Sequence, residues 1–179
     1  MMATDPTQTL EDEHKHILKV IERVKAISEQ ITNGKQVSGE QLNEIVEFMR
    51  NYADRCHHGK EEAILFPFLL GKGAPEEGCP IGALKQEHII GREQVHAIAD
   101  NADAYLGGDE QARQKLLNAL NRIIKLYPNH IWKEDYLLFP MTHKVCSAED
   151  LGELNEQFNA ADDQFGREVI KGYEEFANA

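Results

Sequence analysis

The sequence has few of the features that mark secreted or membrane-embedded proteins. Its three cysteines, Cys56, Cys79 and Cys146, are odd in number and form no CxxC pair, which favours reduced thiols over a disulfide framework. The longest apolar run, residues 63–70, is interrupted by a proline and is less than half of the ~20 residues that a membrane span needs. The first 13 residues lack a basic cluster followed by an apolar stretch, as a secretory signal would have. We therefore expect a cytoplasmic protein without a membrane span.

Basic charge is also scarce. The chain has 19 Lys and Arg against 31 Asp and Glu, a net charge of -12. Such a balance argues against a surface for nucleic acid or anionic lipid, although it could dock a basic redox partner protein. The 179 residues, 41% of them hydrophobic, are enough to bury one core. We expect residues 1–179 to form a single domain that binds neither nucleic acid nor membranes.

What the sequence does contain is helical periodicity. Apolar residues recur every three or four positions in five segments, and no segment alternates with the period of two that a strand requires. Capping residues and Gly or Pro stops bound these segments at about residues 6–31, 38–68, 81–106, 109–141 and 147–176. Pro128 falls inside the fourth segment, so we expect a kink or interruption there. The patterns predict an all-α protein.

The two halves of the chain repeat each other. Residues 10–14 read LEDEH, and residues 84–88 read LKQEH. Residues 57–67 read HHGKEEAILFP, and residues 130–140 read HIWKEDYLLFP. Two helical hairpins with equivalent groups can pack about a pseudo-twofold axis. The repeat predicts an up-and-down antiparallel four-helix bundle with a central site, followed by an additional C-terminal helix.

Six side chains with metal-ligand chemistry fall on the buried faces of these helices. Residues four apart share a helix face, so His57 points the same way as Glu61, and His130 the same way as Glu134. One more histidine interrupts the apolar stripe of the first and of the third helix. Unpaired polar groups are costly in an apolar bundle, and a shared pair of iron, zinc or manganese ions would satisfy them. The candidate metal ligands are His14, His57, Glu61, His88, His130 and Glu134.

The order of these groups is a histidine, an HxxxE motif, a second histidine and a second HxxxE motif, with Leu-Phe-Pro after each acid. This order resembles the hemerythrin-like, or HHE cation-binding, domain family over residues 10–141. The resemblance implies a four-helix bundle around two non-haem iron ions, with an oxo or hydroxo bridge, the four histidines as terminal ligands and the two glutamates as bridges. Zinc or another divalent metal could substitute. We expect the bundle at about residues 6–145 and the additional helix at about 147–178.

One position departs from the oxygen-carrying members of the family. They have a fifth histidine one turn after the one on the third helix, and here Arg92 stands in its place. Arginine cannot ligate a metal, so one ion lacks a ligand unless His58, Glu62, Asp135, a tyrosine or water replaces it. We interpret His58, Glu62 and Asp135 as groups that orient the metal ligands. Arg92 either pairs with a carboxylate or attracts an anion near the centre, or it extends into solvent.

Three functions suit such a centre. The first is binding of a small diatomic molecule, oxygen or nitric oxide, for sensing, scavenging or storage, and an apolar, water-poor pocket favours such a neutral ligand. The second is a redox enzyme acting on peroxide, nitric oxide or oxygen. The third is an iron-storage or iron-responsive module. We favour the binding protein, either as a monomer or as a homodimer paired through the C-terminal helix.

Overall fold

The computed structural model describes residues 5–179, which form helices and connecting turns with no strand among them. The predicted all-α class is confirmed. In chain order the α-helices (α) and π-helical segments (η) are α1 Pro6–Thr32, α2 Gly39–Phe48, η1 Met49–His58, η2 Glu61–Leu65, α3 Phe66–Gly71, α4 Ile81–Leu106, α5 Glu110–Lys133, η3 Glu134–Leu138, α6 Phe139–Val145, α7 Ala148–Phe165 and α8 Arg167–Asn178.

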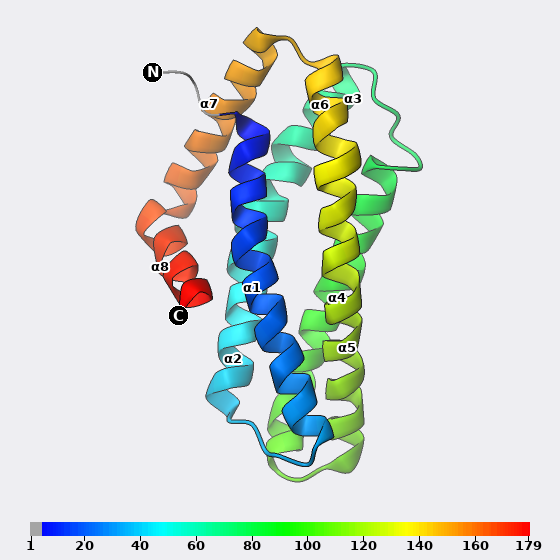
Figure 1. Cartoon of the computed structure of the whole chain (residues 1–179), viewed down its shortest axis with the longest axis vertical. Coiled ribbons are helices and arrows are strands. Elements are labelled where there is room, and N and C mark those ends of the chain that lie inside the picture. The colour runs from blue at the N-terminus through cyan, green and yellow to red at the C-terminus, as the bar shows by residue number, and fades with distance from the viewer. Residues whose placement is uncertain (1–4) are drawn as a thin grey trace.

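Four long helical arms make an up-and-down bundle (Figure 1). The first and third arms are the single helices α1 and α4, whereas the second runs through α2, η1, η2 and α3, and the fourth through α5, η3 and α6. Contacts of α1 with α5, α5 with α4, α4 with α2 and η1 with α1 close the bundle. Helices α7 and α8 then run back along α1 and the second arm, so they cover only one side.

The C-terminal segment is helical as predicted, but it consists of two helices instead of one. Ser147 and Asp150 form a capping box at the start of α7. The helix ends at Gly166, whose φ of +107° is a backbone conformation that other residues rarely adopt. The apolar stripe of the segment continues across this break, which explains why periodicity alone indicated one helix.

Of the predicted kink or interruption at Pro128, the interruption is wrong, because α5 continues through this residue to Lys133. Proline removes one hydrogen bond from the helix interior. Ile123, Tyr127 and Ile131 are buried on the same helix, and their packing compensates for the lost bond. Tertiary burial therefore outweighs the local preference of one residue.

The core has two apolar clusters with a polar layer between them. On α1, Leu10 belongs to the cluster near the start of the chain and Ile17 to the larger cluster, and His14 lies between them. The other three arms repeat this order around their own histidines. Burial of each large apolar side chain contributes ~1.5–3 kcal/mol, so the clusters hold the arms in place above and below the polar layer. Among residues 5–179, no helix has the length and apolar character needed to cross a membrane.

Candidate metal centre

Four buried histidines meet in the bundle interior as two pairs. The first pair joins α1 to η1, with the Nε2 atoms of His14 and His57 3.1 Å apart. The second pair joins α4 to α5, with the Nε2 atoms of His88 and His130 3.2 Å apart. Two ligands of one cation approach this closely, because metal–nitrogen bonds are about 2.0–2.1 Å long. Each pair is therefore placed to hold one cation.

Two fully buried glutamates lie between the histidine pairs. The carboxylate of Glu134 lies 2.9 Å from Nε2 of His14 and 2.8 Å from Nε2 of His130, one imidazole of each pair. The carboxylate of Glu61 approaches the other two imidazoles, at 3.9 Å from Nε2 of His57 and 3.4 Å from Nε2 of His88. Both carboxylates thus reach across from one pair to the other, as ligands bridging two cations would.

The oxygens of these two carboxylates have no hydrogen-bond partner. The imidazole nitrogens approach them, but within residues 5–179 none of the four oxygens of Glu61 and Glu134 makes a hydrogen bond of acceptable geometry. A buried carboxylate without well-directed hydrogen bonds is costly. Cations between the histidine pairs would remove that cost, so these residues fit a two-metal site.

A second layer of carboxylates surrounds the histidines. Each histidine turns its Nε2 toward the centre and its Nδ1 outward to a carboxylate oxygen. The Nδ1–oxygen pairs are His14 with Asp135 at 2.8 Å, His57 with Glu13 at 2.8 Å, His88 with Glu62 at 2.6 Å and His130 with Glu87 at 3.0 Å. Such partners fix the tautomer and orientation of metal-binding imidazoles. The structure thus gives Glu62 and Asp135 the orienting contacts expected of them.

Sequence reasoning did not assign this role to Glu13 and Glu87. Each accepts a further hydrogen bond from a lysine, Glu13 from Lys60 and Glu87 from Lys133. These lysines occupy equivalent places three residues after the histidines of the two HxxxE motifs. The repeat contained the signal, because Glu-His and HxxK occur in both halves, but periodicity alone does not say which arms these side chains join.

The two HxxxE motifs share an unusual backbone. Glu61 begins η2 and Glu134 begins η3, and their carbonyls accept hydrogen bonds from the N–H groups of Phe66 and Phe139, five residues later. Each wide turn directly precedes a Phe-Pro pair, where it makes room for the proline ring against the preceding turn. The repeated Leu-Phe-Pro sequence thus marks the place where the helix widens beside the centre.

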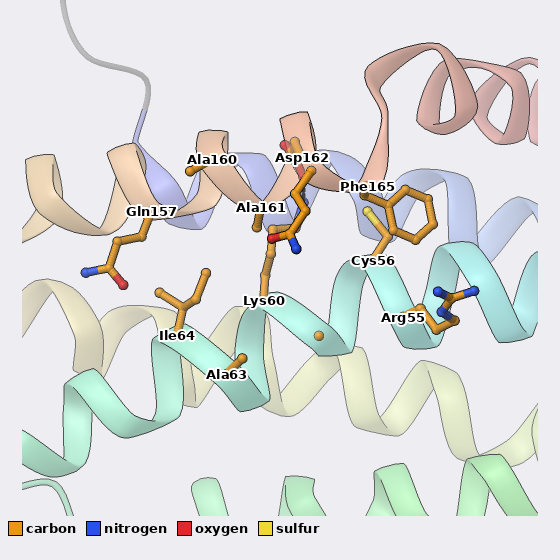
Figure 2. Close-up of a pocket in the computed structure, with 12 residues that line it drawn as sticks. Arg55, Cys56, Lys60, Ala63, Ile64, Gln157, Ala160, Ala161, Asp162 and Phe165 are labelled. Carbon is orange, nitrogen blue, oxygen red and sulfur yellow. Dashed lines mark hydrogen bonds and ion pairs between the residues drawn. The ribbon is translucent and has the colours of Figure 1, made fainter.

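A groove of ≈ 670 Å³ lies outside the histidine cluster, where α7 crosses the second arm (Figure 2). Lys60 is almost fully buried at its wall and donates a hydrogen bond of 2.7 Å to Asp162 of α7. Burial opposes the charge of Lys60, but Glu13, Cys56 and Asp162 raise its pKa above the usual value. The chain from Asp162 through Lys60 and Glu13 connects α7 with the histidines.

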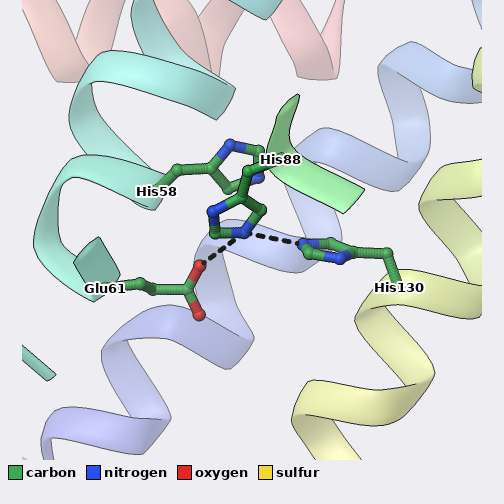
Figure 3. A group of neighbouring side chains, drawn as sticks. All are labelled: His58, Glu61, His88 and His130. Atoms are coloured by element: carbon green, nitrogen blue, oxygen red, sulfur yellow. Dashed lines mark hydrogen bonds and ion pairs between the residues drawn. The ribbon is translucent and has the colours of Figure 1, made fainter. Parts of the chain in front are cut away.

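His58 lies inside the cluster. Glu61, His88, His130 and His58 each bring one ligand atom within 4.8 Å of the others (Figure 3). His14, His57 and Glu134 form a second group of the same kind. The six predicted ligands are therefore all brought together, in two groups, with His58 as an additional member.

Arg92 pairs with carboxylates, one of the alternatives left open by the sequence. Its Nε donates to Asp54 at 2.8 Å and its Nη2 to Glu62 at 2.8 Å. Beside it lies a cavity of ≈ 40 Å³, lined in part by His58 and Tyr127. Arg92 therefore closes the polar layer on this side while a small space adjoins the cluster.

Carboxylates around the cluster raise the pKa of the paired histidines. Burial opposes protonation of His14, but Asp135 and Glu134 raise its pKa to about 10. Burial opposes protonation of His88 and His130 as well, and nearby carboxylates raise their pKa to about 11 and about 9. Burial and the neighbouring His88 instead hold the pKa of His58 well below its usual value. Cations would therefore have to displace protons from the histidine pairs.

Comparisons with known proteins agree with this geometry. The family model described as the hemerythrin HHE cation-binding domain matches residues 5–142 and, in a second alignment, residues 79–178. Uncharacterized proteins Mb2018 of Mycobacterium bovis and Rv1995 of Mycobacterium tuberculosis are each 26% identical over 117 residues. These alignments cover 65% of this chain and 45% of each relative, so the chain matches less than half the length of these relatives. No solved structure matches the chain.

Proposed function

Because this chain belongs to the hemerythrin HHE cation-binding domain family, we propose that it is a non-haem di-iron protein that binds a small diatomic molecule, oxygen or nitric oxide, for sensing, scavenging or storage. One observation carries the proposal. Glu61 and Glu134 each approach one imidazole of each histidine pair, and their buried oxygens have no hydrogen-bond partner in residues 5–179. Two cations bridged by carboxylates are the simplest arrangement that satisfies all of these groups.

Each ion has its own pair of imidazole ligands in this proposal. His14 and His57 hold one ion, His88 and His130 hold the other, and the two glutamates bridge them. Imidazole and carboxylate donors suit iron, and they also admit zinc or manganese. Two bound iron ions would supply a redox-active pair with a coordination position for an exchangeable ligand.

The surrounding residues favour a small ligand. Apolar clusters lie on both sides of the polar layer, and the four histidines and two glutamates at its centre are at most 3% exposed. The adjoining cavity of ≈ 40 Å³ has room for about one water molecule, and a diatomic gas is of similar size. The outer carboxylates meanwhile accept hydrogen bonds from the Nδ1 atoms and keep each Nε2 directed inward.

Metal analysis combined with visible spectroscopy tests the proposal. We expect iron-loaded wild type to contain about two irons per chain, as in other di-iron bundles, and to show an oxo-bridge absorption band. Reduction should remove the band, and exposure to oxygen or nitric oxide should produce a new one. The double variant His57→Ala with His130→Ala removes one ligand from each ion and should lose both iron and band. The control His143→Ala removes a histidine outside the cluster and should behave like wild type.

Two outcomes would contradict the proposal. Iron content well below one per chain, unchanged by the double variant, would mean that the buried histidines are structural. If the protein binds two irons per chain but neither oxygen nor nitric oxide alters its spectrum, it binds metal but not the proposed diatomic ligand.

A further inference from the structure

Two large aromatic side chains are exposed on the side of the bundle that α7 and α8 leave uncovered (Figure 1). Trp132 is 53% exposed and Tyr136 65%, and their rings stack with the centroids 5.5 Å apart. Trp132 also lines a hollow of ≈ 680 Å³ between α4 and α5. The residues that line this hollow, together with Tyr136, form the α4–α5 face. Tryptophan and tyrosine are enriched at the centres of protein interfaces, so this face is a candidate interface.

The repeat shows what covers the equivalent place in the other half of the chain. Trp132 and Tyr136 are the third and seventh residues of the segment 130–140, and Gly59 and Ala63 have these places in the segment 57–67. Gly59 and Ala63 line the groove where α7 crosses the second arm (Figure 2). Small residues let a helix approach closely, whereas two aromatic rings hold it away. The α4–α5 face therefore suits a broader partner surface than a single helix such as α7.

Charge on the α4–α5 face is divided between its two helices. The charged residues that line the hollow are Glu87 and Glu93 on α4, and Arg122, Lys125 and Lys133 on α5. Glu87 and Lys133 pair with each other, whereas the other three are exposed and accessible to a partner. The face thus has an acidic side and a basic side, with aromatic residues next to them.

This division makes the face complementary to itself. A two-fold axis parallel to the bundle places the acidic side of one copy against the basic side of the other, and does so twice. The net charge of -12 makes two copies repel each other elsewhere, so a face with both signs is where they can meet. We propose that the α4–α5 face binds the same face of a second copy and forms a symmetric homodimer. The metal cluster is not part of this interface, so its test is independent of the proposed function.

Sedimentation velocity of the full-length chain and of charge variants tests the proposal. We expect wild type to form dimers. Glu93→Lys places a lysine against Lys125 of the second copy, and Lys125→Glu places a glutamate against its Glu93, so each variant should weaken the dimer at least about tenfold. An equimolar mixture of the two variants should form dimers again, because each lysine then meets a glutamate. The control Glu44→Lys makes the same charge change at an exposed position of α2 and should leave the dimer intact.

Three outcomes would overturn the proposal. Wild type that stays monomeric up to about 0.1 mM does not pair through this face, and the face is then left for a different protein or for none. Dimers that neither charge variant weakens form through another surface. Two variants that dissociate alone and do not pair when mixed exclude the two-fold arrangement of opposite charges.

Fluorescence gives a second measurement, because Trp132 is the one tryptophan of the chain. Dilution of wild type should shift its emission to longer wavelength, since dissociation exposes the indole ring to water. Tyr136→Ala keeps this reporter and should weaken the dimer at least about tenfold. The control Val169→Ala shortens an exposed apolar residue of α8 and should have no effect. Emission that does not change while dimers dissociate, or a dimer weakened by Val169→Ala alone, would place the interface elsewhere.

Discussion

At the scale of single residues, the centre depends on carboxylates that do not themselves face the cations. Glu87 connects His130 with Lys133, and Glu13 connects His57 with Lys60. Burial opposes the charge of Glu87, but His130 and Lys133 hold its pKa below the usual value. A charged acceptor at this place keeps the Nδ1 proton of the histidine outward and its Nε2 lone pair toward the metal.

The variant Glu87→Gln tests this positioning role. The amide keeps the shape of the side chain but loses the charge that faces Lys133 and the imidazole. We expect the affinity for one of two Co²⁺ ions to fall about 10- to 100-fold, with little change in helix content. The control Glu93→Gln changes an exposed glutamate on the same helix, and an equal loss of affinity in both variants would contradict the specific role of Glu87.

At the scale of elements, a salt bridge couples the C-terminal helices to the bundle. Asp162 of α7 lies 2.7 Å from the buried Nζ of Lys60. Its neighbour Asp163 pairs with Arg167 at the surface, where both side chains are more than half exposed. Removing one partner of a buried ion pair lowers the free energy of unfolding, whereas an exposed ion pair contributes little to it. Asp162 and Asp163 are adjacent on α7, but we expect only Asp162 to contribute substantially to the free energy of unfolding.

We expect Asp162→Asn to lower the free energy of unfolding by about 1–3 kcal/mol, because Lys60 keeps only Glu13 as a charged partner. Asp163→Asn should change it by less than about 0.5 kcal/mol. Urea denaturation of the metal-free protein measures both values. Equal stabilities of the two variants would show that α7 packs on the bundle without help from this ion pair.

At the scale of the whole molecule, metal binding and folding are linked through protons. The raised pKa values of His14, His88 and His130 stabilise the metal-free fold fully below the unfolded value of about 6.5. That contribution is lost as the pH rises toward the folded values, about 9 to 11. Cations displace the same protons, so they bind more tightly as the pH rises.

The stabilisation by metal should therefore increase with pH. We expect saturating Co²⁺ to raise the midpoint of thermal unfolding by roughly 8–16 °C at about pH 8, which corresponds to ~4 kcal/mol for a chain of this size. The increase should be clearly smaller at about pH 6. Scanning calorimetry with and without the ion measures the difference, and the same increase at both values would mean that the histidines are not the ligands.

The fold followed from local patterns, and its departures from them have a tertiary cause. Apolar spacing and capping residues predicted every arm of the bundle, because helix periodicity depends only on residues a few positions apart. The helix break at Gly166, where φ is positive, was not predicted, and Pro128 does not interrupt α5, where neighbouring residues are buried. The wide turns before Pro67 and Pro140 were not predicted either.

The sequence by itself determined which six side chains face inward, since residues four apart share a face of a helix and the repeat places equivalent groups in both halves. Only the tertiary structure decided how they pair. His14 meets Asp135 across 121 positions of sequence, and Lys60 meets Asp162 across 102. Periodicity orients a side chain relative to its own helix and carries no information about the neighbouring one. The place of His58 in the cluster likewise depends on how the arms pack.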